Sequence, residues 1–351
     1  MGKVYLGNTQ LANGTGKIYL GNVELGGGES NEDALIERSL SEITNTTASY
    51  IGSMAFYSLS TLISATFTNA SYVGSMAFYT NTSLNYISLP NCESIDNAAF
   101  AYCGALLSID LPECSYVSAA FSHCSQISSI SLPKLTALTG DAFAYCSSLA
   151  NVYAPILSRI DNNGAFSRCS SLTNIDLPEL LFINGNNAFA DCSKLATISM
   201  PKISAIYGNS NFSGCVKLDN VFLPLLENTG SATFYGCTSM KNISVPELKN
   251  IGSYAFFFDY YLSKIALPKA EVIYSNAFAS CSRMSYIDFN GVSSVPTLSN
   301  INAFTNTPLS NSTYLGYYGS IYVPASLYTA FTTATNWATY SARITSSAVP
   351  S

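Results

Sequence analysis

Cysteine is the residue type in this chain with the widest chemical range. The 351 residues include ten cysteines, and thiols can form disulfides, bind metal ions or act as nucleophiles. Two of them, Cys92 and Cys114, stand two residues after a proline, where later repeats carry Leu135, Leu180 or Leu248. Because that position accepts leucine, we interpret the cysteines as small buried apolar residues. The other eight share a second repeated position: Cys103, Cys124, Cys146, Cys169, Cys192, Cys215, Cys237 and Cys281.

The spacing of the cysteines argues against cross-links and metal sites. Side chains repeated on neighbouring strands run parallel at ~4.8 Å, whereas a disulfide brings two Cβ atoms to ~3.8 Å. We therefore expect free thiols. The sequence contains no C-x-x-C pair, and His123 is its only histidine, so a zinc site is not indicated. We predict no metal and no cofactor.

The remaining polar residues do not indicate catalysis. The position of His123 holds a tyrosine, arginine, aspartate, glycine or serine in other repeats, which indicates a freely varied surface site. Asp110, Asp176 and Asp288 are several repeats apart, too far for paired-carboxylate chemistry. The chain has no G-x-S-x-G, P-loop or dinucleotide fingerprint. We therefore predict that the protein is not an enzyme.

A repeat of 22–23 residues is the element that positions all of these side chains. Its consensus is A-F-x-x-C-x-x-L-x-x-I-x-L-P-x-L-x-x-I, and a fixed period of this size predicts a solenoid of about eleven coils. In a segment such as Asn174 to Leu177, isoleucine and leucine point inward while the alternate residues point outward, as in a strand. The proline that follows ends the strand, and a second short strand comes after it. The repeat is marked by Phe56, Phe78, Phe100, Phe121, Phe143, Phe166, Phe189, Phe212, Phe234, Phe256, Phe278 and Phe304.

The N-terminal residues lie outside this period. Lys3 to Leu11 is echoed by Lys17 to Leu25, and an Asn13-Gly14 turn between them predicts a hairpin or a short ribbon. Two strands are too small to be stable alone, so we predict that residues 1–25 dock on a partner. Gly26 to Gly28 is a flexible joint. The candidate docking side chains are Val4, Tyr5, Leu6, Ile18, Tyr19 and Leu20.

Four segments follow from the pattern. Residues 1–28 are the attachment segment, and residues 29–50 are an N-terminal cap with a short helix from Glu32 to Leu40. Residues 51–305 form the solenoid, and residues 306–351 form a C-terminal cap. In that last segment we expect a final strand from Ser320 to Pro324 and a helix from Ser326 to Ala334. Trp337, the only tryptophan, should anchor the helix on the core.

The composition limits the classes of partner that the protein can bind. Charged residues make up 10% of the chain and the net charge is −6, and no Lys/Arg cluster occurs, which argues against nucleic-acid binding. No stretch is apolar enough to insert into a membrane. The N-terminus has no signal-peptide pattern, so we expect synthesis for the cytosol or for assembly there.

The outward side chains contain two apolar interruptions. The residue after each proline alternates in places between Glu and Lys, but Ile156 and Leu225 stand at this position in two repeats. The same two repeats place Tyr153 and Phe222 in the outward strand slot, three coils or ~14 Å apart. Either local side chains or a neighbouring subunit cover these four residues, or they hold a ligand.

The consensus resembles the BspA-like branch of the leucine-rich repeats over roughly residues 33–345. The closing residues Ile321-Tyr322-Val323-Pro324 and Asn336-Trp337 resemble a module common in such proteins of gut bacteria and their phages. The resemblance implies a mainly β leucine-rich-repeat solenoid with short helical caps. It also implies a surface for extracellular recognition or adhesion and no enzymatic activity. It supplies no fixed binding residues, and this chain differs from secreted members in lacking an export signal.

Two functional hypotheses remain. The first is a phage virion fibre or decoration protein, made in the host cytoplasm, that docks through residues 1–25. It would present the solenoid to a protein or glycan on a host or mucosal surface. The alternative is a bacterial cell-surface adhesin that binds host proteins or glycans.

Overall fold

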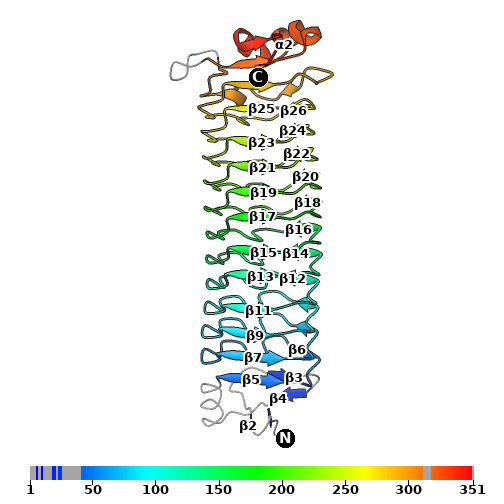
Figure 1. Ribbon diagram of the computed structural model, residues 1–351, viewed down its shortest axis with the longest axis vertical. Coiled ribbons are helices and arrows are strands. Elements are labelled where there is room, and N and C mark those ends of the chain that lie inside the picture. The colour runs from blue at the N-terminus through cyan, green and yellow to red at the C-terminus, as the bar shows by residue number, and fades with distance from the viewer. Residues whose placement is uncertain are drawn as a thin grey trace. The chain divides into compact units, whose positions relative to one another are not determined.

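The computed structural model describes residues 5–6, 9–10, 18–20, 23–25, 41–310 and 318–349. The chain divides into two compact units, Met1–Leu172 and Thr173–Ser351. Each unit is a stack of coils, and each coil contributes one short strand to each of two columns (Figure 1). The prediction of a mainly β solenoid is confirmed.

In unit 1 the first column carries the I-x-L strands and the second carries the strands that follow the proline corners. The first column consists of β5 (Glu42–Asn45), β7 (Ser64–Phe67), β9 (Tyr86–Ser88), β11 (Ser108–Asp110), β13 (Ser129–Ser131) and β15 (Asn151–Tyr153). The second consists of β6 (Tyr50–Ile51), β8 (Tyr72–Val73), β10 (Ser94–Ile95), β12 (Tyr116–Ser118), β14 (Ala137–Thr139) and β16 (Arg159–Asp161).

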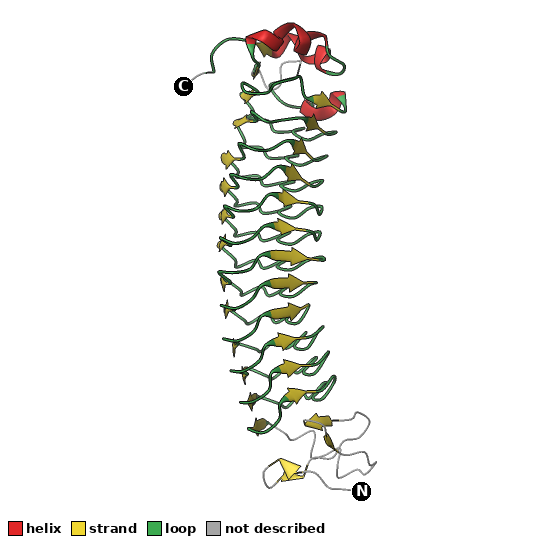
Figure 2. Ribbon diagram, turned by 90° about the vertical axis from the view of Figure 1, so that its right-hand side faces the viewer, coloured by secondary structure: helices red, strands yellow, loops and turns green. Residues whose placement is uncertain are grey.

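Unit 2 repeats this arrangement (Figure 2). Its first column consists of β17 (Asn174–Asp176), β19 (Thr197–Ser199), β21 (Asn220–Phe222), β23 (Asn242–Ser244), β25 (Lys264–Ala266), β27 (Tyr286–Asp288), β29 (Ser320–Tyr322) and β30 (Ile344–Thr345). Its second column consists of β18 (Phe182–Ile183), β20 (Ala205–Ile206), β22 (Asn228–Thr229), β24 (Asn250–Ile251), β26 (Val272–Ile273) and β28 (Thr297–Leu298).

Pairing between coils is parallel and follows the repeat. Ile109 of β11 lies opposite Ile87 of β9 in unit 1, and Ile198 of β19 lies opposite Val221 of β21 in unit 2. Because the register equals the repeat length, each side chain stacks on the equivalent side chain of the next coil. The alternation inside the strands is as predicted, since Ile175 and Leu177 are buried while Asn174 and Asp176 are exposed.

The coils number about 14, more than the eleven expected. β5 begins before residue 51, where the solenoid was predicted to start, and β29 and β30 follow residue 305, where it was predicted to end. Ser320–Tyr322 is therefore not the last strand, because β30 pairs in parallel with β29. β5 and β30 lack the leucine and the proline of the I-x-L-P pattern, so the period does not reveal them.

Stacked phenylalanine rings form the centre of each unit. Ring centroids of successive coils lie 5.1–5.4 Å apart from Phe56 to Phe166 in unit 1. They lie 5.1–5.7 Å apart from Phe189 to Phe304 in unit 2. Strand spacing sets this distance, which is also within the range favoured for offset aromatic stacking.

The cysteines also form columns, and all ten are free and buried. The thiols are free, as expected, but they also donate hydrogen bonds. In seven of the eight cysteines of the main column, Sγ donates to the carbonyl of the phenylalanine one coil earlier, for example Cys146 to Phe121 at 3.1 Å and Cys237 to Phe212 at 3.2 Å. Burial raises the pKa of Cys146 to about 12, so the thiol stays protonated and can keep donating.

The C-terminal cap contains the predicted helix. This helix is α2 (Tyr328–Thr333). Two short 3-10 helices, η1 (Ile301–Phe304) and η2 (Ala325–Leu327), precede it, and a third, η3 (Trp337–Arg343), follows it. Trp337 is buried against Phe289 and Phe331, and its Nε1 donates to the Pro296 carbonyl at 2.7 Å. Its predicted anchoring role is confirmed. None of the helices in the described ranges is long and apolar enough to cross a lipid bilayer.

The N-terminal repeats pair differently from the prediction. β1 (Tyr5–Leu6) pairs with β2 (Thr9–Gln10), and β3 (Ile18–Leu20) pairs with β4 (Val23–Leu25), both antiparallel. Each echo thus pairs with itself as an antiparallel hairpin. β3 also pairs with β6 of the first coil, Leu20 opposite Ile51, so it covers a sheet edge. The predicted Asn13-Gly14 turn and the helix from Glu32 to Leu40 lie outside the described residues.

We predict that Phe212→Ala lowers the free energy of unfolding by about 3–5 kcal/mol. Phe212 is fully buried and stacks on Phe189 and Phe234, so its loss leaves a cavity and interrupts the column. Guanidinium unfolding of the variant measures the effect. Tyr207→Ala is the control, because Tyr207 is 65% exposed and its removal should change stability by at most ~0.5 kcal/mol. Equal midpoints for the two variants would contradict the stacked core.

Candidate functional site

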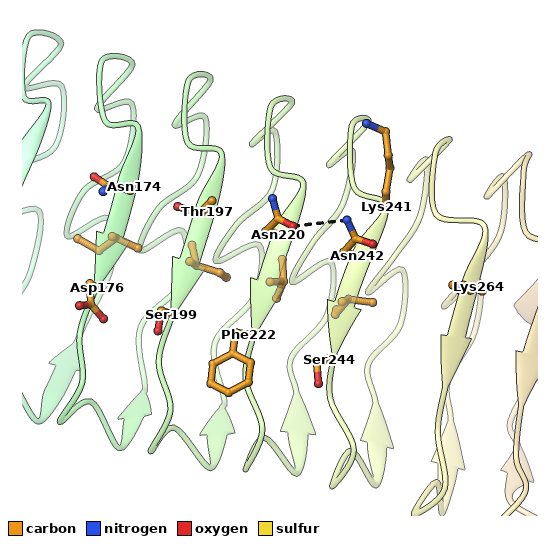
Figure 3. A pocket seen from close by; sticks show the side chains of 14 residues that line it. Asn174, Asp176, Thr197, Ser199, Asn220, Phe222, Lys241, Asn242, Ser244 and Lys264 are labelled. Carbon is orange, nitrogen blue, oxygen red and sulfur yellow. Dashed lines mark hydrogen bonds between the residues drawn. The ribbon is translucent and has the colours of Figure 1, made fainter. Parts of the chain in front are cut away.

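A shallow groove of about 390 Å³ lies across the outward face of β17, β19, β21 and β23 in unit 2. Figure 3 shows its lining side chains projecting from neighbouring strands. Alternation in each strand sends isoleucine or valine into the core and the flanking residues outward. Register then aligns the outward residues of the four strands in two rows.

Phe222 is the one large apolar side chain in these rows. It was predicted as an outward apolar residue, and its side chain is 49% exposed. Its partners in register are Ser199 on one side and Ser244 on the other. Figure 3 shows the ring standing out from its strand between these two small residues, so no bulky neighbour in the row covers it.

The second row is made of amides and a hydroxyl. Asn174, Thr197, Asn220 and Asn242 lie side by side on successive strands. The Asn242 side chain donates to the Asn220 carbonyl oxygen at 3.4 Å. The row therefore offers both donors and acceptors to anything that lies in the groove.

The groove has a different charge at each end. Asp176 lies at the β17 end, while Lys241 and Lys264 line the opposite end. Lys241 is 3.5 Å from Asp219. Lys264 of β25 is exposed and makes no ion pair within the described residues.

The other predicted apolar residues are also exposed. Leu225, after Pro224, is 50% exposed and lies outside the groove lining in unit 2. Tyr153 and Ile156 belong to unit 1 and are 58% and 44% exposed. Local side chains therefore leave all four accessible. The four residues form two separate pairs, one on each unit.

The Glu–Lys alternation forms ion pairs between coils at two of the three places predicted. Lys134 contacts Glu113, and Lys202 lies 2.6 Å from Glu179. A further ion pair between coils joins Lys249 and Glu227 at 3.0 Å. Such exposed pairs contribute a few tenths of a kcal/mol each to stacking.

For the candidate docking residues, the structure shows only the strand in which each one lies. Tyr5 and Leu6 lie in β1, and Ile18, Tyr19 and Leu20 lie in β3. Val4 lies outside the described residues.

His123 lies at a partly buried position and has aromatic neighbours on both sides. Its ring is stacked between Tyr102 and Tyr145 in unit 1, with centroid distances of 4.4 and 4.3 Å. Burial lowers the pKa of His123, and the charge of Asp141 partly opposes that shift. The aromatic character of residues two positions after Phe100, Phe121 and Phe143 was the available sequence signal. No group of three or more metal-ligating side chains occurs in the parts of the chain that the structure describes.

Comparison with known proteins agrees with the coil geometry. The family model for the BspA-type leucine rich repeat region matches residues 31–150, 115–229 and 205–323. The chain belongs to the BspA-type leucine-rich-repeat family. No curated protein matches it.

Several solved leucine-rich-repeat structures are similar to this BspA-type chain. A leucine-rich repeat protein from Bacteroides ovatus is 22% identical, with 72% of this chain and 82% of that chain covered and a TM-score of 0.46. A leucine rich cell surface protein from Faecalibacterium prausnitzii is 19% identical, with 72% and 88% covered and a TM-score of 0.41. A leucine-rich repeat protein of T. pallidum is 25% identical, with 57% and 83% covered and a TM-score of 0.39.

One residue of the BspA-type repeat breaks the cysteine column. Asp259 stands three residues after Phe256, where a cysteine is usual, between Cys237 and Cys281. It is fully buried and neither carboxyl oxygen has a hydrogen-bond partner in the described structure. Burial therefore raises the pKa of Asp259 well above its usual range. Alignment of the repeats would have revealed this residue from the sequence.

We predict that Asp259→Cys stabilises the protein at pH 7 by about 1–3 kcal/mol. Because burial raises the pKa of Asp259 in the folded protein, the carboxyl loses its proton more readily in the unfolded chain, and this difference favours unfolding as the pH rises above the ordinary range of an aspartate. The cysteine can instead donate to the Phe234 carbonyl, as Cys281 does to Phe256.

Guanidinium unfolding at pH 7 and at pH 4 checks this prediction. The gain should shrink as the pH falls toward 4, because protonation of the unfolded state removes the penalty. Asp110→Cys is the control, since Asp110 is exposed, and it should show no pH-dependent gain. An equal gain at both pH values would contradict the buried-carboxyl explanation.

Proposed function

We propose that this chain is a non-enzymatic recognition protein whose outward strand faces bind a protein or glycan on a cell surface. The observation that carries the proposal is Phe222, a half-exposed aromatic ring among outward side chains that are otherwise polar. Leu225 adds a second exposed apolar side chain on the same coil. Exposed apolar residues grouped on a polar surface are typical of interaction sites.

The coil stack favours binding over catalysis. It holds outward side chains at a fixed spacing on a hydrogen-bonded sheet, so little conformational entropy is lost when a ligand binds. The groove contains amides, hydroxyls, one aromatic ring and few charges. These groups hold a ligand by hydrogen bonds and stacking, and none of them is a nucleophile paired with a base.

A double substitution tests the recognition function. We expect Phe222→Ser with Leu225→Ser to reduce binding of the purified protein to immobilised mucin or host cells at least about tenfold, since each buried apolar side chain contributes ~1.5 kcal/mol or more. Tyr207→Ser is the matched control, because it removes an aromatic ring that is exposed elsewhere in unit 2.

Size-exclusion chromatography separates recognition from self-association. If the double variant keeps its binding but changes its oligomeric state, the exposed residues are subunit contacts and the proposal fails. Unchanged binding and an unchanged oligomeric state would equally contradict it.

We further propose that the chain is a phage virion fibre or decoration protein attached through residues 1–25. The two echoed hairpins support this, because small strand pairs gain stability by pairing with another sheet edge. β3 already pairs with β6 in this way. The alternative is a bacterial cell-surface adhesin, and it is favoured if the neighbouring genes encode secretion and cell-wall proteins instead of capsid and tail proteins.

Deletion of residues 1–28 tests attachment. We expect the truncated protein to keep its coils and to lose incorporation into its parent particle, as measured by particle purification and immunoblotting. Its melting temperature should fall by no more than a few degrees, because only one residue pair joins β3 to β6. Normal incorporation of the truncated protein would overturn the role of this segment.

A further inference from the structure

The Phe222 ring is 49% exposed and therefore accessible to a ligand. The buried phenylalanines stack on one another, whereas Phe222 makes no aromatic contact within the described residues. Its neighbours in the row, Ser199 and Ser244, are too small to cover the ring. The negative face of an aromatic ring attracts weakly positive C–H groups, and one face of a sugar ring is a set of such groups.

The amide row lies where the hydroxyls of a stacked sugar would reach. Asn220 is two residues from Phe222 on the same strand, so both side chains point to the same face. The bond between Asn242 and Asn220 uses one donor and one acceptor. The Asn220 NH₂ group and the Asn242 carbonyl oxygen remain, and hydroxyls can pair with both.

The charges at the ends of the groove favour an acidic ligand in one orientation. Lys264 is exposed without an ion-pair partner in the described ranges, so it can bind a carboxylate at the β25 end. Lys241 is already near Asp219. Asp176 at the β17 end repels an anion there. A negative group is therefore attracted to one end only.

The size of the groove fits a short oligosaccharide better than a protein. Its volume of about 390 Å³ is at the lower end of the range for small-molecule sites. A stable protein interface needs ~800 Å² on each partner, and a groove across four strands spans only ~14 Å.

We propose that this groove binds an acidic oligosaccharide, a short glycan that carries a uronic or sialic acid. One sugar ring stacks on Phe222, its hydroxyls bond to the amide row, and the carboxylate of a neighbouring sugar pairs with Lys264. The proposal rests on the recognition function proposed above and gives it a ligand class.

Calorimetric titration of the full chain tests the ligand class. The probes are a hyaluronan tetrasaccharide and 3′-sialyllactose, with lactose as the neutral counterpart. We expect an acidic probe to bind about tenfold more tightly than lactose, because one charge-assisted contact contributes ~1.5 kcal/mol or more. The preference should shrink at high salt, since the Lys264 side chain is exposed and screened.

Two substitutions separate stacking from charge. Phe222→Ala should weaken the acidic and neutral probes alike, by about tenfold. Lys264→Gln should weaken only the acidic probe and remove the preference. Lys217→Gln is the matched control, because Lys217 is exposed in unit 2 and lies outside the groove lining. Circular dichroism of each variant verifies the fold.

The outcomes distinguish this inference from the broader function. If the protein binds cells or mucin but no acidic probe, or if Lys264→Gln leaves the preference intact, the ligand class is wrong and recognition stands. If binding is equal for acidic and neutral probes, the groove takes neutral glycans and the inference is overturned. If neither surfaces nor probes bind, both proposals fail.

Discussion

Backbone hydrogen bonding between equivalent residues of successive coils is the interaction on which the rest of this structure depends. The Phe121 N–H donates to the Ala142 carbonyl at 2.7 Å in unit 1, and the Phe212 N–H donates to the Thr233 carbonyl at 2.8 Å in unit 2. Because each bond joins residues about one repeat apart, the ladder places every side chain over its counterpart. The phenylalanine and cysteine columns follow from this register.

The register between coils also limits which side chains each position of a coil can hold. At Gly230 an added Cβ would lie 1.9 Å from the Gly208 carbonyl oxygen, so the coils there are too close for any side chain. Asp259 shows the opposite case, in which an unsuited side chain is held because the backbone of the adjacent Phe258 remains in the ladder. A local mismatch is accepted when the bonds of the neighbouring coils keep the chain in place.

The same ladder explains why single residues can define a surface. Regular columns of asparagine, serine and threonine make a uniform polar face, and a departure from the column is then a distinct chemical feature at a known position. Phe222 is such a departure, and its serine neighbours leave its ring uncovered. A rigid sheet that carries a few such features can bind a ligand without a conformational change.

Period and alternation by themselves determined most of the fold. One phenylalanine per repeat, the I-x-L strand and the following proline were enough to predict two strands per coil, buried free thiols and outward positions for Tyr153, Ile156, Phe222 and Leu225. The strand β29 was expected, but β5 and β30 were not predictable, because they lack the leucine and the proline of the I-x-L-P pattern.

Only tertiary structure decided how neighbouring coils combine. Three kinds of contact join residues whose types alone do not indicate a contact. They are the pairing of each N-terminal echo with itself, the stacking of His123 between two tyrosines and the thiol bonds to phenylalanine carbonyls. The groove arises in the same way, from Asp176, the amide row, Phe222 and Lys264 on successive strands. A sequence repeat states which side chains face outward, but their contacts depend on distances between coils, and those distances exist only in the folded stack.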